Sequence, residues 1–261
     1  MMKSKSVLGL HIVFALILFS PSATPSLFSQ QEPASQAIDQ AVQAHGNRWL
    51  GGTLSDLVGR GRISVTGDEN SPMEFTLFRK GKNKVQRTII TPSGRILRCG
   101  SNGNRSWHSS GPFSGEAVGN AAHFVESQTD RSIANLFDNI PRGQIVRELV
   151  GQERRKHVPE NASARAMEVH GQAGKKTIYY IDNESFLITR LEFDTGTKYT
   201  MMFNDEAQPV YASYVFSDYR NVNGVMTPFK IESYLGLVKI EEMNFDSVEY
   251  DTGITDDAFV P

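Results

Sequence analysis

Histidine and acidic side chains could bind a metal or transfer protons, but none stands at a spacing typical of such a site. The six histidines are His11, His45, His108, His123, His157 and His170. None is paired with another ligand at a recognised metal spacing. His123 and Glu126 share one expected helix, where a solvated polar face explains both. Asp182 and Glu184 fall in an expected tight turn, which favours Asp because its carboxylate hydrogen-bonds nearby backbone. We therefore predict no metal site and no catalytic residue.

Nucleophile and cofactor motifs are equally scarce. Cys99 is the only cysteine, and a small buried apolar side chain describes it better than a reactive thiol. No P-loop, dinucleotide-binding glycine motif or nucleophile elbow occurs, so we expect no cofactor. Catalytic triads are assembled in space and not in sequence, so a hydrolase or isomerase stays open as an alternative to the expected non-enzyme.

The charge balance argues against nucleic acid as a partner. The formal net charge is −2, whereas a nucleic-acid-binding domain needs a basic surface. The basic run Arg154-Arg155-Lys156 is expected to be a solvated loop.

The first thirty residues resemble an export signal. Lys3 and Lys5 precede an apolar run from Val7 to Phe19, which small and turn-forming residues follow, as in a secretory signal peptide. The run is too short to span a bilayer comfortably, although an uncleaved anchor is the alternative. We expect residues 1–30 to be the signal peptide, with cleavage between Ser22 and Gln30, and 31–261 to form one domain. An exported chain with one cysteine has no internal disulfide, so its stability must come from a core.

The elements expected between residues 31 and 261 are mainly short strands. Apolar residues at helical spacing predict a helix over 35–45 that Gly46 ends. A second amphipathic helix, or two broken near Asp130, is expected over 116–140. Period-two alternation between turn signals predicts antiparallel strands elsewhere. The expected strands are 62–66, 73–77, 85–89, 96–99, 145–150, 166–170, 177–181, 187–193, 198–203, 210–219, 227–234 and 238–250. A sheet of eleven or twelve strands is expected to coil into a barrel, a half-barrel or a sandwich.

Several stretches, in this order along the chain, resemble the outer-membrane lipoprotein carrier superfamily, the LolA/LolB-like proteins. A basic residue in a turn precedes an extended strand, a polar turn precedes Trp107, and two hairpins and the C-terminal residues follow the pattern of the family. The stretches are 77–86, 101–107, 180–188, 217–228 and 257–261. The carrier itself has a Pro after the Arg thought to latch its lid, whereas Lys80-Gly81 follows Arg79 here. The resemblance therefore extends to the cavity and not to that latch.

The resemblance implies a mainly β fold with two or three helices. Its strongly curved antiparallel sheet would form an unclosed β-barrel, and an amphipathic helix, here Val118 to Ile140, would cover the concave face. In the carrier this cavity holds acyl chains of lipoproteins crossing the periplasm. An uncovered apolar concave face would leave a large exposed patch, so a covering helix is physically consistent with the pattern.

From these features we expect a periplasmic, non-enzymatic carrier or sensor that binds lipid or acylated lipoprotein. Envelope donor and acceptor proteins are possible partners, and a monomer is expected. Strand alternation predicts the side chains that line the cavity: Ile63, Val65, Met73, Phe75, Leu77, Val85, Ile89, Leu191, Phe193, Tyr214, Phe216, Phe229 and Ile231, with Val125, Leu136 and Phe137 from the covering helix. The alternatives are an envelope protein-interaction module and, for the apolar residues themselves, ordinary core packing.

Overall fold

Antiparallel strands make up most of the structure, a computed structural model that describes residues 27–46, 54–69, 71–129, 131–133, 137, 146–153, 163–170, 176–201 and 204–261. The helices that lie wholly within the described residues are α1 (Leu27–Ala44), α2 (Gly119–Thr129) and the short 3-10 helix η4 (Asp256–Phe259), and residues 151–153 are also helical. The strands are β1 (Asp56–Val65), β2 (Met73–Lys80), β3 (Lys84–Ile90), β4 (Ile96–Asn102), β5 (Ser106–Ser110), β6 (Phe113–Glu116), β7 (Val146–Glu148), β8 (Ala164–His170), β9 (Lys176–Asp182), β10 (Ile188–Met201), β11 (Asn204–Val222), β12 (Val225–Leu235) and β13 (Val238–Tyr250).

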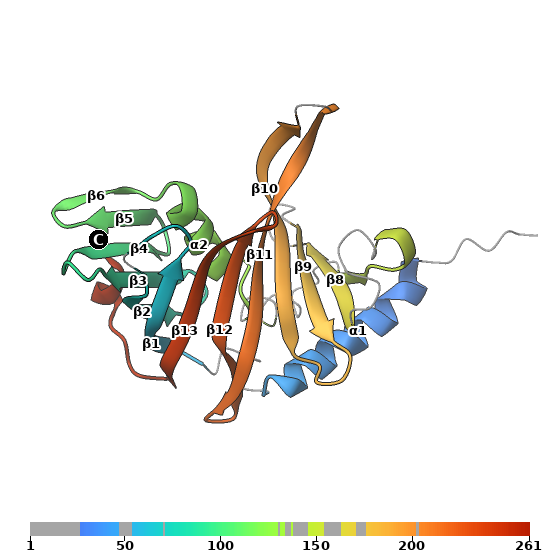
Figure 1. The fold of residues 1–261 in the computed structure, drawn as a ribbon. Helices are drawn as coiled ribbons and strands as arrows, with labels where there is room; N and C mark the ends of the chain where they lie inside the picture. The colour runs from blue at the N-terminus through green and yellow to red at the C-terminus, as the bar shows by residue number, and fades with distance from the viewer. Residues whose placement is uncertain are drawn as a thin grey trace, which may run out of the picture.

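All thirteen strands belong to one sheet that does not close. Their order is β6-β5-β4-β3-β2-β1-β13-β12-β11-β10-β9-β8-β7, so the chain runs outward to β6, returns through α2 to the opposite edge at β7, and then runs back to the middle. The β1–β13 pair, whose partners are far apart in sequence, joins the two halves. The sheet curves strongly between its two edges (Figure 1). This is the mainly β, unclosed barrel that the family resemblance implies.

The inner face of the sheet carries the core because its strands alternate. In β12, buried and half-buried residues alternate along the whole strand, and in β2 Met73, Phe75 and Leu77 are buried. Side chains two residues apart lie on the same face of a strand. The buried residues of both halves join one hydrophobic cluster, which also contains residues of α1 and α2.

Helix α1 packs into this core on the side of the later strands. Ala37, Ile38, Ala41 and Val42 are at most 5% exposed, and they recur at helical spacing as the sequence predicts. The helix starts eight residues earlier than expected, at Leu27. Gly46 follows its last turn with φ of +83°, and a side chain there would lie 1.9 Å from the Gly224 carbonyl oxygen. Glycine is therefore required where the helix ends against the β11–β12 hairpin.

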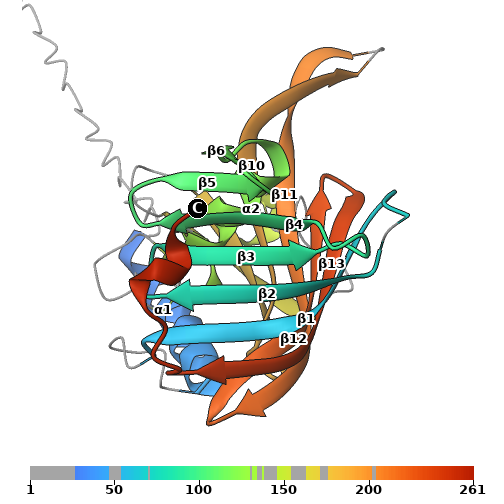
Figure 2. The ribbon, with the colours of Figure 1, turned by 90° about the vertical axis from the view of Figure 1, so that its left-hand side faces the viewer.

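Helix α2 covers the inner face over the early strands. It contacts β3, β4 and β5, and Phe124 and Val125 are buried against the sheet. Figure 2 shows α2 behind β3 and β4, with the C-terminal segment in front of them. Of the expected helix over 116–140, residues 119–129 form α2, while Ala117 and Val118 precede it and Glu116 belongs to β6.

The C-terminal segment crosses the outer face of the early strands. Phe259 in η4 is completely buried, and the Trp107 indole Nε1 donates a hydrogen bond to its carbonyl oxygen at 3.1 Å. Lys80 and Lys84 both form ion pairs with Asp256. The outer face of this half is thus partly covered by the chain itself (Figure 2).

The far ends of β10 and β11 leave the sheet together. Residues from Asp194 onward in β10 pair only with β11 among the described strands, because β9 reaches no further than Phe193. The two strands project as a hairpin beyond the rest of the molecule (Figure 1).

The structure also corrects several boundaries. The strands expected over 187–193 and 198–203 are joined, because β10 runs from Ile188 to Met201 with register shifts in its pairing to β11; residues 202 and 203 lie outside the described residues. Strands β5 and β6 were not expected, because Ser, Gly and His give 106–116 no clear apolar alternation. The expected signal segment lies outside the described residues up to residue 26, so it stays a prediction. No helix in the described part of the chain is long and apolar enough to cross a membrane.

Candidate functional site

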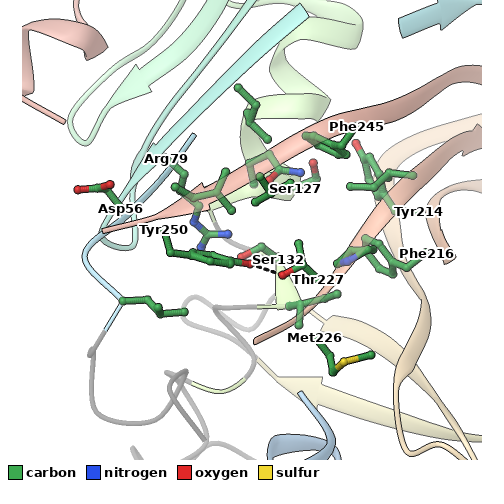
Figure 3. A pocket seen from close by; sticks show the side chains of 18 of the residues that line it. Asp56, Arg79, Ser127, Ser132, Tyr214, Phe216, Met226, Thr227, Phe245 and Tyr250 are labelled. Carbon is green, nitrogen blue, oxygen red and sulfur yellow. Dashed lines mark hydrogen bonds between the residues drawn. The ribbon is translucent and has the colours of Figure 1, made fainter. Parts of the chain in front are cut away.

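A cavity of about 280 Å³ lies between the inner face of the sheet and the end of α2. Strands β1, β2, β10, β11, β12 and β13 form its walls, and residues of α2 and of the segment after it contribute to its lining (Figure 3). The described lining residues are Leu54, Ser55, Asp56, Leu57, Leu77, Arg79, Gly81, Lys82, Ser127, Gln128, Ser132, Ile133, Leu191, Tyr214, Phe216, Met226, Thr227, Pro228, Ile231, Phe245, Val248 and Tyr250.

The deep wall of the cavity is apolar. Leu191, Phe216, Ile231 and Phe245 come from four neighbouring strands and are all buried. Pockets for small ligands are typically about 300–1,000 Å³ with mainly apolar walls and a few polar groups. At about 280 Å³, this cavity falls just below that range.

Exposed residues mark the place where the cavity reaches the surface. Ser55 and Gly81 are exposed and lie side by side, because β1 begins where β2 ends, and Gly81 donates a backbone hydrogen bond to the Ser55 carbonyl oxygen. Lys82 and Arg79 lie on the same rim and are half-buried.

Asp56 fixes the rim to the C-terminal segment. Its carboxylate accepts hydrogen bonds from the backbone of Thr252, Gly253 and Ile254, and from the hydroxyls of Thr252 and Ser55. Burial alone would raise the pKa of Asp56, but these hydrogen bonds outweigh it and hold the pKa below its ordinary value. Both carboxylate oxygens are therefore engaged in structure.

Tyr250 and Thr227 form the floor near this rim. Their hydroxyl oxygens are 2.8 Å apart in a buried hydrogen bond (Figure 3). This bond pairs the two hydroxyl groups with each other within the cavity wall.

The sequence-predicted lining residues divide into two groups. Leu77, Leu191, Tyr214, Phe216 and Ile231 line the cavity. The remaining described residues belong to the hydrophobic core away from the cavity wall, and all are buried except the half-buried Val65: Ile63, Met73, Phe75, Val85, Ile89, Val125, Phe137, Phe193 and Phe229. Leu136 lies outside the described residues. Whether any of them contacts a lipid stays a prediction.

The inner face also holds a buried ion pair. Arg87 lies between Val85 and Ile89 on β3, and its Nη1 is 2.8 Å from Glu241 Oε1 on β13. The two side chains are 7% and 10% exposed. The guanidinium also lies 3.9 Å from the centre of the Phe124 ring on α2. Strand alternation could have revealed Arg87 from the sequence, because it places residues 85, 87 and 89 on one face.

A second arginine approaches the sheet from the end of α2. Arg131 is 5% exposed, and its guanidinium lies 3.9 Å from the centre of the Phe193 ring on β10. One of its nitrogens, Nη2, is 3.3 Å from Glu126 Oε1, while Nε and Nη1 are buried without a hydrogen-bond partner. No helix or strand periodicity at this position indicated a buried cation.

Neither a metal centre nor an activated nucleophile is assembled among the described side chains. No group of three or more histidine, cysteine, aspartate or glutamate residues gathers there. Cys99 is buried, and burial raises the pKa of its thiol despite the nearby Arg87. A buried thiol with a raised pKa is a weak nucleophile.

Comparison with known proteins identifies the fold. A LolA superfamily protein from Nitrosomonas europaea matches with a TM-score of 0.50 and 13% identity, over 87% of this chain and 97% of that one. An outer membrane lipoprotein-sorting protein domain from Vibrio parahaemolyticus matches with a TM-score of 0.51 and 9% identity, over 87% and 96%. No protein-family model and no curated protein matches the sequence. As the sequence resemblance predicts, the chain has a LolA-like fold.

Proposed function

We propose that the protein is a periplasmic, non-enzymatic carrier or sensor that binds an acyl chain of a lipid or an acylated lipoprotein in the cavity under α2. The observation that carries this proposal is the cavity itself, an unfilled space with an apolar deep wall in an otherwise buried core. The LolA-like fold supports it, because one of the neighbours is named as a lipoprotein-sorting domain.

Burial of acyl methylenes provides the driving force. Each CH₂ group moved from water to an apolar site contributes about 0.8 kcal/mol. A few methylenes in the cavity thus suffice for weak binding, and a longer chain needs α2 to move away from the sheet. Donor and acceptor proteins of the envelope would then deliver and receive the cargo.

Native mass spectrometry of protein purified gently from cells tests the proposal. We expect a species whose mass exceeds that of the chain by one lipid or acyl group. A protein that is consistently free of added mass, and that binds no added palmitoyl lipid, contradicts the proposal.

A matched pair of substitutions locates the binding. Ile231→Trp introduces bulk on the cavity wall, whereas Lys230→Trp places the same side chain on the outer face, where Lys230 pairs with Glu232 and Glu242. We expect only Ile231→Trp to lower the bound fraction. Thermal unfolding checks that both variants fold, since overpacking costs about 1–3 kcal/mol.

A protein-interaction module is the second candidate, and the edge strand β6 favours it. All four residues of β6 are exposed, and Phe113 is 78% exposed. An open strand edge can take an extended peptide as an added strand. This function predicts that Phe113→Lys abolishes capture of an envelope protein and leaves any bound lipid unchanged.

A further inference from the structure

The lining of the cavity ends at the same level on two neighbouring strands. On β12, Thr227 and Ile231 line the cavity, whereas Ser233, which shares the face of Ile231, does not. On β13, Phe245 lines the cavity, whereas Glu241 on the same face does not. Ser233 and Glu241 are directly opposite each other in the β12–β13 pair. The cavity therefore ends before this pair of residues on both strands.

A row of buried polar side chains stands at this deep end. Tyr214 of β11 lines the cavity and is opposite Ser233. The Ser233 hydroxyl donates a hydrogen bond to Glu241 Oε1 at 3.3 Å, and the same oxygen is 2.8 Å from Arg87 Nη1. All four residues are at most 8% exposed. We call Tyr214, Ser233, Glu241 and Arg87 the polar row. In Figure 3, Tyr214 lies at one end of the lining residues and Tyr250, near the rim, at the other.

The ion pair of the polar row crosses the concave side of the sheet. Arg87 is on β3 and Glu241 on β13, and β2 and β1 lie between these strands. Three strand spacings are roughly 14 Å along the sheet, so the two side chains meet above β1 and β2. The rings of Phe75 and Phe245, whose centres are 5.1 Å apart, meet across β1 in the same way. The enclosed space is thus obstructed at its deep end by side chains from both sides.

An acyl chain has little to gain beyond the polar row. Methylene groups form no hydrogen bonds, and a chain that separates the ion pair leaves buried charges without a partner. This penalty exceeds the gain from burying one or two further CH₂ groups. All four members of the row belong to strands, so the row stays in place when α2 moves away from the sheet.

The distance from the rim to the polar row corresponds to a chain length. Thr227 and Ser233 are six residues apart on β12, which is roughly 20 Å at the rise of a strand. An extended chain advances roughly 1.2 Å per bond, because three backbone bonds span up to about 3.6 Å. Roughly sixteen bonds therefore fit, as in palmitate. A volume of about 280 Å³ over this length leaves a cross-section of roughly 14 Å², with no room for a second chain because packed carbon atoms lie about 4 Å apart.

We infer that the cavity takes a single acyl chain and that the polar row limits the length of this chain to about that of palmitate. This inference rests on the proposed function and specifies its ligand. The polar row then determines specificity, because it decides where the chain end stops.

Isothermal titration calorimetry of the whole protein with saturated fatty acids from octanoate to eicosanoate tests the inference. Each fatty acid is delivered from methyl-β-cyclodextrin, and its separately measured affinity for the cyclodextrin corrects the result. We expect one fatty acid per protein. The affinity should rise about fourfold with each added CH₂ group up to about palmitate, and then stop rising.

Changes in the polar row should move this limit. Tyr214→Ala opens the deep end, and the double variant Arg87→Met with Glu241→Met replaces the ion pair by adaptable apolar side chains. In each we expect the affinity to keep rising as far as eicosanoate. Ile231→Ala is the control, because it also shortens a side chain that lines the cavity but lies outside the polar row. It should lower the affinity for the longer chains and leave the limit at palmitate.

The outcomes separate the two proposals. An affinity that keeps rising beyond palmitate in the unmodified protein, or more than one fatty acid per protein, overturns this inference and leaves the proposed function standing. A limit that stays at palmitate in the variants of the polar row also overturns it. If thermal unfolding shows that Tyr214→Ala does not fold, the double variant alone decides. If no fatty acid binds, the proposed function itself fails.

Discussion

The two helices cover the same inner face in different ways. The side of α1 that faces the sheet consists of small and branched apolar residues, Ala37, Ile38, Ala41 and Val42, which are all buried and line no part of the cavity. The cavity side of α2 presents Ser127 and Gln128, and the ring of its Phe124 packs against the guanidinium of Arg87. One helix completes a core, whereas the other covers a space.

The two helices also differ in how they are attached to the sheet. After the end of α1, the His45 carbonyl oxygen accepts a backbone hydrogen bond from Met226, and Gly46 fits closely against the next hairpin. Two arginine–phenylalanine contacts connect this region to the sheet. Arg87 of β3 contacts Phe124 of α2, and Arg131, which follows α2, contacts Phe193 of β10. We interpret α1 as a fixed part of the core and α2 as the element that opens for cargo.

The largest effect is expected for the ion pair beneath α2. Arg87→Met leaves Glu241 buried without its partner, and breaking a buried pair on one side costs about 3–5 kcal/mol. The double variant Arg87→Met with Glu241→Met should recover most of the free energy of unfolding, because both desolvation penalties disappear. Urea denaturation measures both variants. A single variant that unfolds like the unmodified protein would show that the pair is solvated.

The second-largest loss in the free energy of unfolding is expected when packing is removed from α1. Ile38→Ala leaves a cavity in a filled core and is expected to lower the free energy of unfolding by about 2–5 kcal/mol. Val42→Ala on α1 and Val125→Ala on α2 are the matched pair, because each shortens a buried valine to alanine. The contrast between the helices is wrong if Val125→Ala costs more than Val42→Ala in urea denaturation.

Acid should weaken the end of α1 through His45. The ring is buried against Phe137 and Tyr219, its Nδ1 is 2.8 Å from the Ala41 carbonyl oxygen, and burial lowers the pKa from 6.5 to about 4. The unfolded chain therefore binds a proton more readily, so stability is complete above pH 6.5 and decreases as the pH falls to about 4. The loss should reach roughly 3 kcal/mol.

Urea denaturation between pH 7 and 4 of the protein and of His45→Phe measures this contribution as a difference. The hydrogen-bonded carboxylate of Glu242 titrates lower, since its pKa is about 2. If both proteins lose stability equally across the window, His45 is not the group responsible.

The smallest expected effect concerns the attachment of α2 alone. Phe124→Leu removes the ring that Arg87 contacts without changing a described lining residue of the cavity, and should cost about 1–2 kcal/mol. Hydrogen exchange should then increase in residues 119–129 before it increases in α1, because local opening needs only the contacts of that segment. Equal acceleration in both helices would contradict separate opening.

Periodicity predicted most of the strands and the core face of α1, whereas the unclosed barrel was predicted by the family resemblance. Alternation predicted that the expected lining residues lie on the inner face. Every one of them that the structure describes belongs to the central core or packs against it. The same alternation places Arg79 and Arg87 on that face, but the expected lining included only apolar and aromatic residues. Strands β5 and β6 were missed because their residues give no period-two signal.

The cavity itself was beyond sequence reasoning. Whether Leu191 and Phe193, on one face of one strand, border a space or fill it depends on what the covering elements present to them. Leu191 lines the cavity, whereas Phe193 packs against Arg131. That distinction arises from contacts between distant segments, which local patterns do not contain.

Photolabelling with a palmitate analogue that carries a diazirine near its chain end tests the central claim most directly. After irradiation and digestion, we expect the label on cavity-lining residues such as Leu191, Phe216, Ile231 and Phe245, and its loss with excess unlabelled palmitate. Label confined to the outer face, or label that excess palmitate does not displace, would contradict the claim that the space under α2 binds an acyl chain.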